Sequence, residues 1–286
     1  MNEVVINFTP TGLIPRKKDN PFTPISANEI IEEVHSAYET GITMVHLHAR
    51  DEVTELPSFS SRHYAAIIEG IRKVAPALVL GVSTSGRYGI DLASRMEVLE
   101  LDGPAKPDMA SLTLSSLNFN QQASINSPET IIALAGKMKD RKIKPELEAF
   151  DAGMLNYAQY LARKKWIEPP FYVNLILGNI ACAQADLLHA ALMVERLPEP
   201  CLFSMGGIGQ AQLRVNSLAI SMGYGVRVGL EDNYWYDGNR TKLATNQDLL
   251  RRIHTILAAN ERVVMTSKDF RKKMALLPGQ GQYGCL

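Results

Sequence analysis

Cysteine is scarce in this sequence, with three residues among 286: Cys182, Cys201 and Cys285. Their number is odd, and no two of them stand at Cys-x-x-Cys spacing. A disulfide framework needs pairs and a thiolate zinc site needs closely spaced ligands, so both are disfavoured. We expect three free thiols.

The sequence also lacks net charge, because 30 lysines and arginines balance 30 aspartates and glutamates. No overall field attracts nucleic acid or an anionic membrane, so we expect neither as a partner. No apolar run approaches the roughly 18 residues of a membrane span. The first strand-like segment follows the start of the chain directly, without a basic and apolar leader. We therefore expect a soluble cytoplasmic protein.

Two catalytic signatures are missing as well. No Gly-x-Gly-x-x-Gly follows the first strand-like segment, and no Gly-x-Ser-x-Gly surrounds any serine. The first absence disfavours an open dinucleotide-binding sheet, and the second disfavours a serine nucleophile at a strand-to-helix elbow.

What is present is an alternation of strand and helix patterns along the whole chain. Apolar, strand-like segments occur at residues 4–9, 44–49, 77–82, 109–114, 144–150, 171–177, 201–205 and 226–229. Helical patterns follow them at residues 26–39, 60–74, 90–101, 127–140, 154–164, 183–196, 209–222 and 245–260. Ser26 with Glu29 forms a capping-box pattern, and Pro128 stands at a first helical position.

Eight strand-then-helix units without hairpin signals predict an all-parallel sheet closed into a (β/α)8 TIM barrel. An open doubly wound sheet is the alternative. Residues 1–286 then form one domain, and a short last helix near 267–277 lies in a tail, about 261–286, that packs outside the barrel.

The most informative stretch is residues 43–51, TMVHLHARD, which carries His46 and His48 to the end of a strand. Side chains two apart on a strand share a face, at about 7 Å between Cα atoms. Closure of the barrel makes the eighth strand a neighbour of the first, which brings Glu231 near this pair. Two histidines and a carboxylate predict a zinc site, although the same set can hold Fe(II). A pair of merely hydrogen-bonded barrel histidines is the alternative.

Arg227 occupies an inward position of the eighth strand, where a cation needs carboxylate partners. Glu148 on the fifth strand and Asp232 are the expected partners. Asp232, oriented by Arg227, is our candidate general base beside the metal. The alternative is an ion-pair plug that only fills the barrel.

Hydroxyl groups and glycines at other strand ends predict the substrate side of the site. Ser83 and Thr84 follow the third strand, and Ser111 and Thr113 lie in the fourth. The glycine loop with Gly207 and Gly209 follows the seventh strand, where barrels often bind phosphate, so a diphosphate-bearing cofactor is one interpretation and a tight turn is the other.

With these residues in place, the chain resembles the β-keto acid cleavage enzymes, which include 3-keto-5-aminohexanoate cleavage enzyme. The resemblance is carried, almost end to end, by motifs in this order: PTG at 10–12, HLHAR at 46–50, Ser83 with Thr84, KPDMASL at 106–112, PELEAFDAGM at 145–154, GIG at 207–209 and RVGLEDN at 227–233.

The resemblance implies a zinc-dependent acyltransferase, often tetrameric, that cleaves a β-keto acid with acetyl-CoA to acetoacetate and a new acyl-CoA. It implies zinc on His46, His48 and Glu231, with Asp232 as the base. Ser83 would bind the substrate carboxylate. Ser111 and Thr113 stand where the family has threonine and asparagine. A metal-dependent aldolase or decarboxylase without CoA is one alternative, and a non-catalytic metal-bearing binding protein is another.

One departure concerns the substrate. Ile14 stands where the amino-keto acid enzyme has a glutamate that holds a substrate ammonium group. We therefore predict that Ile14→Glu raises the relative kcat/KM for amino-bearing keto acids, because an apolar side chain cannot balance a cation. Unchanged relative kcat/KM values across acids with charged and neutral tails would show that position 14 does not contact the tail.

Overall fold

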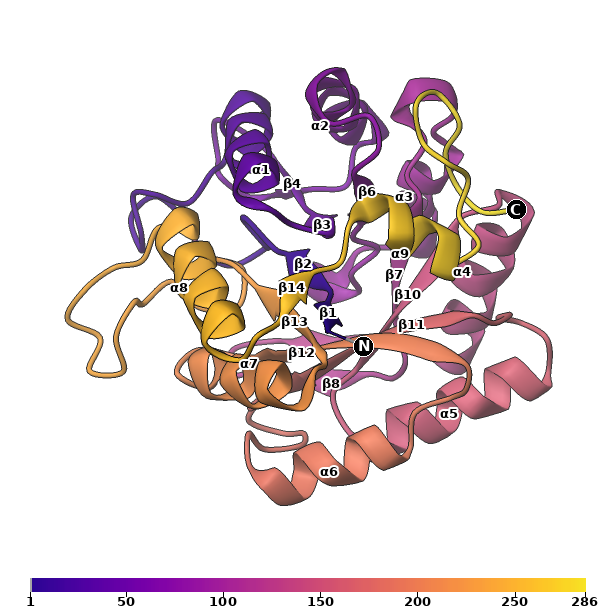
Figure 1. Ribbon diagram of the computed structural model, residues 1–286. Coiled ribbons are helices and arrows are strands. Elements are labelled where there is room, and N and C mark those ends of the chain that lie inside the picture. The colour runs from indigo at the N-terminus through magenta and orange to yellow at the C-terminus, as the bar shows by residue number, and fades with distance from the viewer. Residues whose placement is uncertain (1) are drawn as a thin grey trace.

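The protein is described by a computed structural model that covers residues 2–286. Eight parallel strands form the closed barrel predicted from the sequence (Figure 1). In barrel order they are β2 (Ile6–Phe8), β3 (Met44–Leu47), β6 (Val79–Val82), β7 (Met109–Thr113), β10 (Lys144–Ala149), β11 (Phe171–Leu177), β12 (Cys201–Gly207) and β13 (Gly225–Val228). The barrel closes between β13 and β2, where Arg227 pairs with Asn7.

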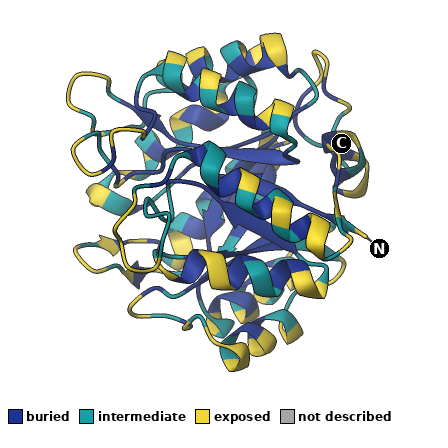
Figure 2. Ribbon diagram, turned by 60° about the vertical axis from the view of Figure 1, so that its left-hand side comes forward, coloured by how far each residue is buried: buried dark blue, intermediate teal, exposed yellow. Residues whose placement is uncertain are grey.

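Helices surround the strands, and their exposed residues lie on the side away from the strands (Figure 2). They are α1 (Ala27–Thr40), α2 (Ser61–Val74), α3 (Leu92–Met96), α4 (Pro128–Asp140), α5 (Ala152–Arg163), α6 (Leu187–Glu195), α7 (Ala211–Met222) and α8 (Asn246–Ala259). The capping box of Ser26 with Glu29 forms as predicted, and Pro128 opens α4. Within residues 2–286, no helix is both long and apolar enough to cross a membrane.

Two helices differ from the sequence prediction. The expected helix at 90–101 is a short α-helix followed by the 3-10 turn Glu97–Glu100. The expected helix at 183–196 begins at Leu187, because Asp186 caps it by accepting a hydrogen bond from the backbone N–H of His189. Small hairpins also lie in the loops: β4 (Ala49–Arg50) pairs with β5 (Pro57–Ser58), and β8 (Leu117–Asn118) pairs with β9 (Ala123–Ser124).

The C-terminal tail covers the end of the barrel at which the strands begin, called the barrel floor below. Strand β14 (Val263–Val264) pairs with β1 (Glu3–Val4), and helix α9 (Ser267–Lys273) follows (Figure 1). Phe270 is fully buried against the apolar residues that point inward at this end, which include Val5, Met44, Val79, Met109 and Tyr172. The tail therefore covers the barrel floor, where apolar side chains would otherwise face water, and not the helical outside.

A buried ion cluster fixes this tail to the barrel. The Asp108 carboxylate is fully buried and accepts hydrogen bonds from Arg271 at 2.7 and 2.9 Å and from Arg72 at 3.0 Å. The backbone N–H groups of Leu80 and Gly284 also donate to it. Burial alone would raise the pKa of Asp108, but the two guanidinium groups outweigh burial and hold this pKa below its usual value.

We predict that Asp108 contributes stability that depends on pH. A lowered folded-state pKa stabilises the fold above pH about 4 and loses this effect as the pH falls through the folded value. Asp108→Asn should lower the free energy of unfolding at pH 7 by about 3–5 kcal/mol, because two buried arginines lose their counterion. Urea unfolding at pH 7 and below pH 4 measures the difference, which should shrink in acid.

The control is Asp102→Asn, since the Asp102 side chain is 72% exposed in its contact with Arg141. It should change the free energy of unfolding by less than about 1 kcal/mol at either pH. A destabilisation by Asp108→Asn that is the same at both pH values would contradict the proposed ionised cluster.

Candidate active site

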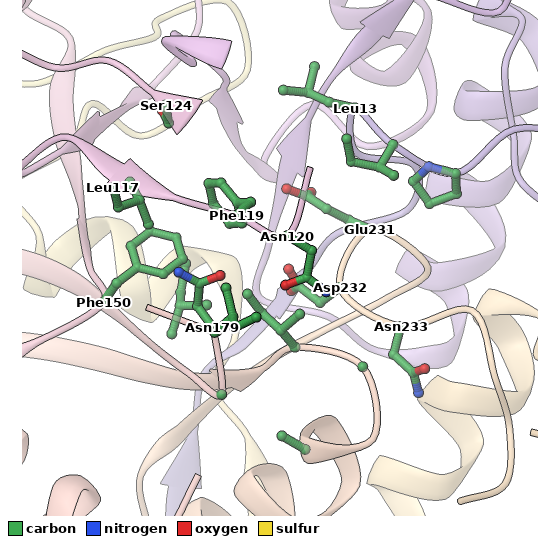
Figure 3. Close-up of a pocket in the computed structure, with 18 of the residues that line it drawn as sticks. Leu13, Leu117, Phe119, Asn120, Ser124, Phe150, Asn179, Glu231, Asp232 and Asn233 are labelled. Atoms are coloured by element: carbon green, nitrogen blue, oxygen red, sulfur yellow. The ribbon is translucent and has the colours of Figure 1, made fainter. Parts of the chain in front are cut away.

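A cavity of about 840 Å³ opens at the C-terminal ends of the barrel strands. Every loop that follows a barrel strand contributes to its wall. Figure 3 shows Glu231 and Asp232 on one side, Phe119 with Leu117 and Phe150 on another, and Leu13 above them. Charged groups and apolar groups thus occupy different parts of the wall.

The predicted histidine pair meets the predicted carboxylate in this cavity. His46 lies one residue before the end of β3 and His48 directly follows the strand, and both are buried. Nε2 of His46 lies 3.2 Å from Nε2 of His48, which lies 3.1 Å from Oε1 of Glu231. One ligand atom from each residue lies within 4.8 Å of the others. Barrel closure produces this meeting, since β2 alone separates β13 from β3.

Gly12 allows Glu231 to reach the histidines. Its φ of +65° is in the left-handed region, and a Cβ atom there would lie 2.5 Å from Cγ of Glu231. No side chain fits between this loop and the carboxylate without moving it, which gives the PTG motif a steric reason.

Glu146 orients the imidazole of His46 through its Nδ1 atom, on the side away from His48 and Glu231. Nδ1 of His46 lies 2.8 Å from Oε2 of Glu146, whose other oxygen accepts hydrogen bonds from the side-chain amides of Asn7 at 2.7 Å and Asn174 at 2.6 Å. A carboxylate at Nδ1 fixes the proton there and leaves the Nε2 lone pair free to bind a cation. The sequence patterns indicated no role for Asn7 or Asn174, whereas Glu146 shares a strand face with Glu148, a predicted residue of the site.

The donor set fits a divalent cation. Burial lowers the pKa of His48 to about 4, so this imidazole is neutral. Burial also lowers the pKa of His46, but Glu146 and Glu231 outweigh it and raise the value to about 9. Oε2 of Glu231 is buried without a hydrogen-bond partner in the described chain. Two imidazole nitrogens and an acidic oxygen facing one another form a site for positive charge, and metal binding at His46 displaces a proton.

Arg227 connects this group to the candidate base. Its Nε donates to Oδ2 of Asp232 at 2.9 Å, and its Nη2 donates to Oε1 of Glu231 at 2.7 Å. Glu148 lies farther away, at 3.9 Å, and accepts a hydrogen bond from Thr113 at 2.7 Å. The sequence predicted Glu148 and Asp232 as partners, whereas the structure adds Glu231 as a close one. Burial raises the pKa of Asp232, and the nearby Arg227 only partly opposes this shift.

A family model for the beta-keto acid cleavage enzymes matches residues 3–276. The chain belongs to this family. This β-keto acid cleavage enzyme has the histidine pair, Glu231 and Asp232 together at one end of its closed (β/α)8 barrel.

Characterised relatives match over nearly their whole lengths. The chain is 34% identical to a 3-oxoadipate:acetyl-CoA acetyltransferase of Cupriavidus necator, across 95% of this chain and 94% of that protein. It is 31% identical to a 3-keto-5-aminohexanoate cleavage enzyme of Fusobacterium nucleatum, across 96% and 99%. In both relatives the similarity therefore spans the whole barrel.

Solved structures confirm the barrel fold. The apo structure of ObcA matches with a TM-score of 0.79 at 21% identity, across 89% of this chain. This chain spans 65% of the ObcA chain. At this identity the match establishes the fold alone.

The remaining residues that the sequence assigned to this β-keto acid cleavage enzyme site divide into two groups. Ser83, Thr113, Ile14 and Gly209 line the cavity. Thr84, Ser111 and Gly207 do not.

Thr84 and Ser111 are buried and bonded to each other, with the Thr84 hydroxyl donating to the Ser111 carbonyl at 2.6 Å. They join β6 to β7 and do not contact the cavity. Gly207 ends β12 against α7, where a Cβ atom would lie 2.6 Å from the backbone of Ala211. Its role is close packing of a helix on a strand.

The sequence analysis missed Arg87 and Phe119, which both line the cavity. Arg87 stands three residues after Thr84, in the loop whose Ser83 and Thr84 hydroxyls were predicted to belong to the site. Phe119 lies in the small hairpin after β7, and nothing in its local pattern marks it as part of a site.

We predict that His48→Ala loses most of the bound metal, because one of the three ligand atoms disappears. The barrel should still fold, because β3 ends before residue 48. Elemental analysis of protein prepared with zinc measures the loss, and circular dichroism checks the fold. His63→Ala is the control, since His63 lies on α2 outside the ligand group. Equal zinc content in wild type and His48→Ala would contradict the site.

Proposed function

We propose that this protein is a zinc-dependent acyltransferase that cleaves a short β-keto acid with acetyl-CoA, releasing acetoacetate and an acyl-CoA. The observation that carries the proposal is the meeting of His46, His48 and Glu231 beside a buried Asp232 held by Arg227. The names of three relatives include acetyl-CoA, with 3-oxoadipate, 3-dehydrocarnitine and 3,5-dioxohexanoate as the other partners. The choice of zinc rests on its preference for such ligands.

The reaction exchanges two acyl partners without an oxidant. The α-carbon of the keto acid forms a bond to the acetyl carbon of acetyl-CoA, and the CoA thiolate leaves. The thiolate then attacks the original keto carbon, and the bond between that carbon and the α-carbon breaks. The acetoacetate enolate that leaves takes back the proton that was removed from the α-carbon in the first step. The products are acetoacetate, which contains the α-carbon and the carboxylate, and a CoA ester of the remaining acyl group.

The residues of this chain suit the first proton transfer. A divalent ion on the His-His-Glu group would supply Lewis-acid polarisation of the keto oxygen. Asp232 would take the α-proton, and its raised pKa strengthens it as a base. Arg227 holds Oδ2 of Asp232 in place, so the other oxygen is free for the substrate. Ser83 lines the cavity with a hydroxyl group that can donate to the substrate carboxylate, whereas the hydroxyl of Thr113, also on the wall, already donates to Glu148.

The cavity also suits the coenzyme. Its volume of about 840 Å³ exceeds the need of a short keto acid, and its rim includes Gly209 and Arg214 at the start of α7. We place the CoA chain there, which keeps a coenzyme role for Gly209 but not for Gly207.

Homo-oligomeric assembly, with a tetramer as the form we expect, remains a prediction. Exposed apolar side chains support it on α6 and on the loop before it, where Leu188 is 78% and Ile180 is 66% exposed. The cytoplasmic location is likewise a prediction.

We predict that metal-loaded wild-type protein releases acetoacetate from acetyl-CoA and a β-keto acid, and that Asp232→Asn lowers kcat by about 10²–10⁴-fold, because the amide cannot accept the proton. Zinc content and the KM for acetyl-CoA should stay close to wild type. An enzymatic acetoacetate assay measures the rate.

Asp140→Asn, at the exposed end of α4, is the matched control and should keep full activity. A reaction that proceeds equally well without acetyl-CoA would replace the proposal with a metal-dependent aldolase or decarboxylase. Full activity of Asp232→Asn would remove Asp232 as the base.

A further inference from the structure

Arg87 reaches the cavity wall in an unusual setting. It lies in the 3-10 turn Arg87–Gly89 after β6, and its Cζ lies 3.4 Å from the centre of the Phe119 ring. Phe119 in turn meets Phe150 edge to face, with ring centres 5.7 Å apart. A guanidinium over an aromatic face is held in one plane and keeps its N–H edge available to a ligand.

The loop that carries Arg87 is fixed before any ligand arrives. Arg95 is buried and donates to the carbonyl of Thr84 at 2.8 Å and to that of Ile125 at 3.1 Å. The backbone N–H of Ile125 also donates to the carbonyl of Gly86 at 3.1 Å. These bonds tie the loop after β6 to the β8–β9 hairpin that contains Phe119. Such a support positions a binding group precisely enough for selectivity.

The charge of Arg87 has no contacting counterion in the described chain. Its side chain makes no hydrogen bond and no ion pair with any residue from 2 to 286. The acidic residues of the cavity wall are Glu148, Glu231 and Asp232, and all three already contact Arg227. Burial lowers the pKa of Arg87, so the cation pays a desolvation penalty without a contacting counterion.

One part of the cavity wall is apolar and offers no counterion to a cation. Leu13, Ile14 and Pro15 form that part of the wall. The wall residues whose charge is free of Arg227 are Arg87, Arg214 and Arg240, and all are positive. A positively charged substrate tail would therefore find no carboxylate on this wall that is free of Arg227, whereas a negative tail would find a guanidinium without a contacting counterion.

From this geometry we propose that Arg87 binds a carboxylate at the far end of the substrate, so that the β-keto acid cleaved here is a 3-oxo dicarboxylate. The proposal rests on the proposed function, because it assigns the substrate class of the same cavity. Within residues 2–286 no ion pair joins Arg87 to Glu148, Glu231 or Asp232, so a ligand carboxylate can reach its guanidinium without displacing a protein partner. A planar guanidinium matches a carboxylate with two parallel hydrogen bonds.

Arg87 has one simpler role that the experiment must separate from this one. Its charge also acts at longer range on Glu148, Glu231 and Asp232. If Arg87 only balanced these carboxylates, its removal would affect every substrate alike. A residue that binds the tail affects only substrates with an anionic tail.

Binding of unreactive acids to the metal-loaded protein tests the proposal without turnover. Titration calorimetry should show that wild type binds glutarate about tenfold or more tightly than pentanoate, which lacks the second carboxylate. Arg87→Ala should lose this preference, and Arg87→Lys should keep part of it, because lysine retains the charge but not the planar fork. Arg240→Ala, another arginine of the cavity wall, should keep all of it, and circular dichroism checks each fold.

Turnover supplies the second arm, with 3-oxoadipate, 3-oxohexanoate and 3-keto-5-aminohexanoate as anionic, neutral and cationic tails. Wild type should have its highest kcat/KM with 3-oxoadipate. Arg87→Ala should lower that value about tenfold or more and leave the value for 3-oxohexanoate within about twofold.

An equal loss for all three acids, or a raised KM for acetyl-CoA with an unchanged tail preference, would overturn the proposal. Failure of the proposed function looks different: no acid would yield acetoacetate, while Arg87-dependent binding of glutarate would persist. Acetoacetate from the neutral or cationic acid alone, without a glutarate preference, would refute the role of Arg87 and leave the proposed function standing.

Discussion

One carboxylate oxygen connects the whole site. Oε1 of Glu231 lies 3.1 Å from Nε2 of His48 and 2.7 Å from Nη2 of Arg227, inside a protein where unpaired charge is costly. His48 follows β3, whereas Arg227 lies in β13 and Glu231 follows that strand. In the closed barrel β2 is the one strand between β13 and β3, so the ends of these two strands lie close together. The arrangement is therefore available only after closure, and it gives Asp232, which shares Arg227, a fixed place beside the histidines.

The barrel interior changes character along its axis. At the N-terminal ends of the strands it is apolar, and α9 covers it with Phe270. At the middle it contains Glu146, whose oxygens are satisfied by His46, Asn7 and Asn174. A buried carboxylate without such partners would destabilise the fold by several kcal/mol, so this network is needed for stability as well as for the orientation of His46. The main apolar core lies between the strands and the helices, and a smaller apolar cluster fills the floor, so the upper layer of the barrel interior can contain polar groups.

The residues proposed for the reaction and those proposed for substrate selection lie on different parts of the fold. The groups assigned to the reaction stand on or next to strand ends, where the barrel fixes their positions. The groups assigned to the substrate tail, Arg87 and Ile14, stand on loops, and loops accept changes that strands do not. This division is consistent with a family whose members are named for acids with different tails.

The sequence by itself determined the eight-unit barrel, since strand and helix periods alternate along the chain, and from closure it placed Glu231 beside His46 and His48. It also identified Arg227 and Asp232, because a cation at an inward strand position needs a carboxylate partner and Asp232 is close to it in the sequence. Only the tertiary structure decided that Thr84 and Ser111 bond to each other away from the cavity, that Arg87 lies on Phe119, and that the tail covers the barrel floor. Residue periodicity specifies which way a strand residue points, but the course of a loop depends on contacts between segments far apart in the chain, which no local pattern contains.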